Sequence, residues 1–156
     1  MVAADWLRIP LMLLHGLAGA AWFGSIFYGV FVLYPRVNRS FDHIAERERL
    51  FLALSHGARW HMIAALGLVA SSGLGLLLFP RNELTWSYMT LIGMKAALMI
   101  ASTILFWRVS WFWWPARLFA LEAELPAIYR RFRIGAACML VLVGLSFVLG
   151  VLTRVI

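Results

Sequence analysis

The chain has 156 residues, of which 63% are hydrophobic and 13% charged, whereas a soluble domain is nearer half apolar and a quarter charged. This composition excludes an ordinary soluble protein and predicts an all-α integral membrane protein with one domain. The net charge of +7 comes from arginines at the ends of apolar runs, which favours membrane orientation over nucleic-acid binding. The single cysteine, Cys138, excludes an intrachain disulfide.

Four apolar segments follow one another along the chain, each near the roughly 20 residues that a helix needs to cross a bilayer. They are residues 9–34, 60–79, 88–107 and 134–153. Pro35 and Pro115 lie beyond the ends of the first and third segments, where a helix can stop without penalty. The sequence therefore predicts a four-helix bundle in the lipid bilayer. No internal repeat is evident, although two hairpins are symmetrical in outline.

The arginines predict the orientation of this bundle. Ten lie on the side of the two long connections: Arg36, Arg39, Arg47, Arg49, Arg59, Arg108, Arg117, Arg130, Arg131 and Arg133. Three lie on the opposite side: Arg8, Arg81 and Arg154. Because arginine is enriched on the cytoplasmic side, we expect both termini on the periplasmic side of a bacterial inner membrane. The connecting segment 41–56 has helical spacing and is expected to lie along the interface.

Ionisable side chains within the apolar segments are the candidates for function, because their burial in a membrane is costly. His15 lies in the first segment, Lys95 in the third, and His61 near the boundary of the second. Counted from the middle of each segment, His15 and Lys95 are expected about 7 Å apart in depth, while His61 falls well to the cytoplasmic side. The expected pair is therefore His15 with Lys95.

A neutral imidazole and a neutral amine both donate a lone pair to a metal. Two such donors across a bundle core predict the axial ligands of a b-type haem. Gly19 and Trp22 share a helix face with His15, where a small residue leaves room for a flat macrocycle. The simpler interpretations are a structural histidine that bonds a neighbouring backbone, and a lysine that reaches toward the interface.

Arg59 and His61 begin the second apolar segment. We expect them either to bind haem propionates or an anionic head group, or to act as ordinary interfacial anchors.

Four short motifs carry a resemblance to a known family. They are "LLHGLAGAAWFGSIFY" at residues 13–28, an arginine at the start of the second segment, "GMKAALMI" at 93–100 and "YRRFR" at 129–133. The set resembles the flavin-free, haem-containing bacterial membrane protoporphyrinogen oxidases, and the layout is similar to the copper resistance protein D family. The first resemblance implies that His15 and Lys95 are haem ligands.

We expect a haem protein that transfers electrons or oxidises a hydrophobic reductant. The reductant would be a porphyrinogen or a quinol. The chain is expected to act alone, as a homo-oligomer or with a redox partner. One alternative is a copper-handling membrane protein, whose thioether donors would come from Met12, Met62, Met89, Met94 and Met99. Met94 and Met99 are five residues apart, and no MxxM or MxxxM cluster is present, which weakens this case. The other alternative is an accessory subunit without a cofactor, in which His15 and Lys95 contact a partner.

Overall fold

The computed structural model describes residues 2–79 and 85–155. Within these ranges every regular element is helical, which confirms the all-α class. The elements are α1 (Val2–Tyr28), η1 (Gly29–Leu33), α2 (Tyr34–Ser40), α3 (Ile44–Ser55), α4 (Ala58–Leu78), α5 (Trp86–Arg108), η2 (Val109–Trp113), α6 (Trp114–Leu118) and α7 (Leu125–Val155). The two η elements are π-helical turns.

Among the described residues, four helical stretches are long and apolar enough to cross a membrane. They are Trp6–Ser40, Ala58–Leu78, Trp86–Leu118 and Leu125–Thr153. Many of their large apolar side chains face outward, such as Leu17, Leu74 and Ile100, which are 70%, 66% and 60% exposed. A soluble monomer rarely exposes apolar surface on this scale, whereas a lipid-facing bundle does. The four long apolar helices expected from the sequence are therefore present.

The first and third stretches run further than the sequence predicted, because neither helix stops before its proline. The Tyr34 N–H donates to the Gly29 carbonyl, five residues back, and the Trp114 N–H donates to Val109 in the same way. These wider turns come just before Pro35 and Pro115, which begin α2 and α6. A proline at the start of a helical segment lacks only an N–H that the segment does not use, so the rod continues.

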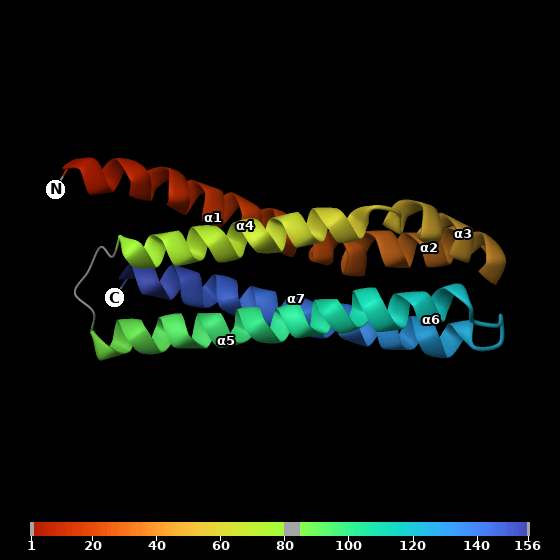
Figure 1. Cartoon of the computed structure of the whole chain (residues 1–156). Coiled ribbons are helices and arrows are strands. Elements are labelled where there is room, and N and C mark those ends of the chain that lie inside the picture. Colours follow the sequence, from red (N-terminus) through yellow and green to blue (C-terminus); the bar gives the residue numbers. More distant parts are fainter. Residues whose placement is uncertain (1, 80–84, 156) are drawn as a thin grey trace.

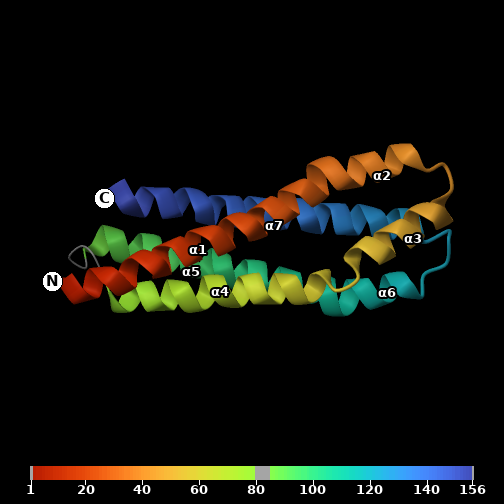
Figure 2. The same cartoon turned by 90° about the horizontal axis from the view of Figure 1, so that it is seen from above.

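The helices form two hairpins, α1 with α4 and α5 with α7, and α1 also packs against α7. Figures 1 and 2 show the N- and C-termini at the same end of the bundle, which we call the terminal end. The opposite end, called the distal end, carries α2, α3 and α6. The elements at and beside the distal end also carry the ten arginines counted above. Arg81 and the side chain of Arg154 lie outside the described residues.

The two hairpins repeat one backbone plan that the sequence alone does not reveal. The two π-helical turns begin 80 residues apart, at Gly29 and Val109, and both are five residues long. Adding 80 to the number of Pro35 gives Pro115, so turn and proline recur in the same register. The elements from α1 to α4 and those from α5 to α7 are thus two versions of one hairpin.

Aromatic contacts beside the π-helical turns follow the same register. The rings of Phe27 and Phe31 are 4.7 Å apart between centroids, and those of Trp107 and Trp111, each 80 residues later, are 4.1 Å apart. The returning helices α4 and α7 also correspond, at a spacing of 77 residues. The residues identical at this spacing are Met62 with Met139, Gly67 with Gly144, Leu68 with Leu145, and Gly73 with Gly150.

Two buried clusters hold the hairpins together. Trp22, Met139 and Val143 form one cluster along the bundle, where Met62 and Met99 also pack. The second lies at the distal end and joins α2, α3 and α7 through Val37, Phe51, Leu125 and Tyr129.

Candidate functional site

His15 is held by α4 at a defined ring orientation. Its Nδ1 lies 3.0 Å from the Val69 carbonyl oxygen and 3.1 Å from the Ser72 hydroxyl oxygen. A carbonyl oxygen only accepts, so Nδ1 carries a proton that it donates. The Ser72 hydroxyl donates to the Leu68 carbonyl and can therefore accept from His15. In the neutral ring this assigns the lone pair to Nε2, the nitrogen that can bind a metal.

A glycine makes room for this imidazole. A Cβ atom at Gly73 would lie 3.1 Å from His15 Cε1, closer than side chains normally approach. The glycine therefore allows α1 and α4 to pack with the ring between them. The backbone hydrogen bond expected of a structural histidine is present at His15, and a bond of this kind also orients a metal-ligating histidine.

Lys95 occupies the matching position of the second hairpin, because it lies 80 residues after His15. It is half-buried, and a Cβ atom at Gly150 of α7 would lie 3.4 Å from its Nζ. Gly73 and Gly150 are themselves a matching pair. The difference of about 7 Å in depth between His15 and Lys95 was counted from the middles of two segments that differ in length. The register of the π-helical turns instead gives His15 and Lys95 equivalent places.

The structure places the two residues in different hairpins, each beside the returning helix of its own hairpin. Contact between α1 and α7 joins these hairpins. Trp22 is 4% exposed and belongs to the central cluster with Met139, so its main observed role is packing. Gly19 has open space beside it, since a Cβ there would meet nothing within 4 Å.

Arg59 and His61 lie at a different level from His15. At about 1.5 Å per residue, they are roughly 15 and 12 Å along α4 from Val69. Arg59 Nη2 donates to the Ser110 carbonyl at 2.7 Å, and its guanidinium lies 4.8 Å from the centre of the Trp111 ring. This contact ties the first hairpin to η2 of the second. His61 is exposed, with Nδ1 3.1 Å from the Gly57 carbonyl oxygen.

A buried ion pair at the distal end was not found by sequence reasoning. Arg117 Nε and Nη2 donate to the two carboxylate oxygens of Glu48 at 2.7 and 2.8 Å, and the Tyr129 hydroxyl donates to the same carboxylate at 2.5 Å. Arg117 is only 7% exposed and lies over four aromatic rings, those of Phe51, Trp114, Tyr129 and Phe132. The sequence offered one sign of this ion pair, the arginine that follows "WFWWP". Its partner Glu48 lies 69 residues earlier in the chain.

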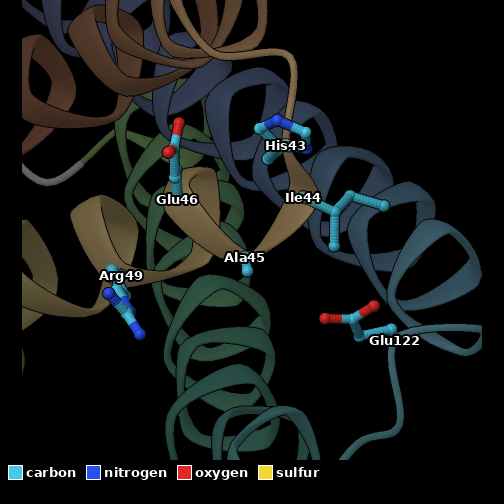
Figure 3. Close-up of a pocket in the computed structure, with 6 residues that line it drawn as sticks. All are labelled: His43, Ile44, Ala45, Glu46, Arg49 and Glu122. Carbon is cyan, nitrogen blue, oxygen red and sulfur yellow. The ribbon is translucent and has the colours of Figure 1, made fainter.

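An open pocket of about 380 Å³ also lies at the distal end, beside the start of α3. His43, Glu46 and Arg49 line it from α3 and the residue before it, and Glu122 faces them from the link before α7 (Figure 3). Acidic and basic groups alternate here. Among the described residues no three His, Cys, Asp or Glu side chains come together in a way that could hold a metal ion, in this pocket or elsewhere.

No protein-family model, curated protein or solved structure matches this chain.

Proposed function

We propose that this chain is a multi-pass protein of the bacterial inner membrane that binds one b-type haem between its two hairpins. His15 Nε2 and Lys95 Nζ would hold the haem iron. The observation that carries the proposal is the equivalence of these residues: the only lysine of the chain stands where the matching hairpin has its intramembrane histidine. Two nitrogen donors related by an internal repeat would be suitable ligands for a haem iron.

The donor chemistry fits a haem iron. His15 donates Nδ1–H to the Val69 carbonyl, and such a bond fixes the tautomer and the ring plane of a metal ligand. Lys95 brings an amine into a largely apolar helix, where an ionisable group is rare unless it has a function. Open space beside Gly19 would leave room for a planar group next to α1. A bound haem would supply a one-electron redox couple whose potential depends on these ligands.

The rest of the chain would orient the protein and admit a hydrophobic reductant. The arginine-rich distal end would face the cytoplasm and the termini the periplasm, because arginine is retained on the cytoplasmic side. Arg59 would act mainly as a link between hairpins, since Ser110 already accepts from it. The reductant would be a porphyrinogen or a quinol that reaches the site through the bilayer, with electrons passing to a second copy or a separate redox protein.

A second candidate function is copper handling, and one observation favours it. Met62 and Met99 both pack against the buried cluster that contains Met139, although the three are far apart in sequence. Thioether sulfur is a soft ligand that prefers copper(I). Methionines are also common gap-filling residues in cores, which is the simpler interpretation of this cluster.

Absorption spectra and metal analysis of detergent-purified protein distinguish these functions. After expression with added haem, the wild type should be red, with a Soret band and a reduced α-band typical of b-type haem. His15→Ala and Lys95→Ala should each lose haem or shift its bands, while His56→Ala, at an exposed distal histidine, should match the wild type. A colourless wild type that binds copper(I), and loses it in Met62→Leu/Met139→Leu, would favour the second candidate.

A further inference from the structure

A groove at the distal end combines arginine with apolar side chains. Its volume is about 790 Å³, and it lies between η2 and α6 on one side and the first turns of α7 on the other. Its lining residues include Trp113, Ala127, Ile128, Arg130, Arg131 and Ile134. It therefore runs from the polar link before α7 to Ile134, the residue at which the fourth apolar segment begins.

The two arginines of this groove are exposed, and one of them is held by an aromatic wall. The Arg131 guanidinium lies 5.7 Å from the centre of the Trp113 ring. Stacking on a ring leaves the edge of the guanidinium available for the paired hydrogen bonds that phosphate accepts. Glu124 also lines the groove, but its Oε2 accepts from the Leu121 N–H at 3.0 Å. This hydrogen bond stabilises the turn before α7.

Trp113 is fixed in this position by Gly135. A Cβ atom at Gly135 would lie 2.7 Å from Trp113 Cζ3, so only glycine lets the indole lie this close to α7. The ring also packs edge-on against Phe132, with centroids 6.1 Å apart. The aromatic wall is therefore part of the packed bundle rather than a mobile surface side chain.

We propose that this groove binds an anionic phospholipid of the phosphatidylglycerol class. Arg130 and Arg131 bind its phosphate, and Trp113, Ile128 and Ile134 contact the glycerol backbone and the first part of an acyl chain. Charge complementarity selects the occupant, because basic pockets at the cytoplasmic boundary of membrane helices attract anionic head groups. The position of the groove, at the start of an apolar segment, matches the boundary between head group and chain.

The test uses the full chain in nanodiscs of equal parts phosphatidylglycerol and phosphatidylcholine. After mild detergent extraction, native mass spectrometry counts the lipids that stay bound. The wild type should retain phosphatidylglycerol selectively, and Arg130→Gln/Arg131→Gln should reduce its retention about thirtyfold, because two arginines near a membrane surface together contribute about 2 kcal/mol. Arg36→Gln/Arg39→Gln removes the same charge from exposed residues of α2 that do not line the groove, so it should change retention less than about twofold.

A second variant tests the groove without changing its charge. Ala127→Trp places a large side chain in the groove and leaves both arginines in place, so it should also reduce lipid retention. Equal losses in the two arginine double variants would overturn the proposal, because they would show a general attraction to the basic end. Retention unchanged in Ala127→Trp, or equal retention of the two lipids by the wild type, would overturn it as well.

Discussion

The first hairpin and the second share a backbone plan but differ in the chemistry at matching positions. Both contain a π-helical turn, a proline just after it and an aromatic pair beside it, with tilted rings in the first hairpin and stacked rings in the second. Yet His15 corresponds to Lys95, and Val37 corresponds to Arg117. The plan is thus independent of these side chains, because turn and proline recur while the polar residues change.

The pair Val37 and Arg117 shows what such a difference requires. Both side chains are buried, at 4% and 7% exposure. The valine needs only apolar neighbours, whereas the arginine has the Glu48 carboxylate, the Tyr129 hydroxyl beside it and four rings over its guanidinium. Charge is therefore tolerated at this position only because α3 supplies a carboxylate.

The largest expected effect comes from breaking that pair. Glu48→Gln leaves the Arg117 charge buried without its counter-charge, which should lower the free energy of unfolding by about 3–5 kcal/mol. Val37→Ala, at the matching position, removes only apolar contact and should cost about 1–2 kcal/mol. Unfolding in sodium dodecyl sulfate, followed by circular dichroism, measures both.

The double variant Glu48→Gln/Arg117→Met is the control for this prediction. It removes both charges and should recover much of the loss, because apolar replacement of a whole buried pair is often neutral. A loss below about 0.5 kcal/mol in Glu48→Gln alone would show that the pair is solvated and contributes little.

A smaller effect is expected at Trp113, which takes the place of Leu33 in the first hairpin. Gly135→Ala would put a methyl group 2.7 Å from the indole, so the ring must move and unfolding free energy should fall by about 1–3 kcal/mol. Gly144→Ala on the same helix would meet Phe23 at 3.5 Å, an ordinary contact, and serves as the control. Thermal unfolding in detergent should rank the two; equal midpoints would contradict the packing described here.

The smallest expected effect is the difference in stability between alanine variants of Gly73 and Gly150, the glycines that face His15 and Lys95. Gly73→Ala crowds a ring held by two hydrogen bonds and should cost about 1 kcal/mol. Gly150→Ala meets the flexible end of Lys95 at 3.4 Å and should stay within about 0.5 kcal/mol of the wild type. The same thermal unfolding assay compares them, and a larger loss for Gly150→Ala would reverse this assignment.

Much of the fold could be predicted because it depends on segment length and composition. Four apolar segments and the arginine-rich end follow from the sequence, as does the choice of His15 and Lys95 as polar residues inside the bundle. The continuation of the two helices past Pro35 and Pro115 could not be predicted, because a proline ends most helices. No local sequence pattern indicated the π-helical turns that precede the two prolines.

The long-range partners were equally hidden from the sequence. Arg59 bonds a carbonyl of η2, and Glu48 meets Arg117 across 69 residues. Such contacts depend on how two hairpins pack, which a periodic pattern does not encode. The repeat was missed because turn and proline are preserved while most side chains differ.

The most direct test of the central claim is to make the two hairpins chemically alike. Lys95→His should keep one haem per chain, but with the electron paramagnetic resonance spectrum and absorption bands of two histidine ligands, while Lys95→Leu should lose haem or become high-spin. That result would establish that Lys95 binds the haem iron. A haem spectrum identical in the wild type, Lys95→His and Lys95→Leu, or a wild type without haem, would contradict the account.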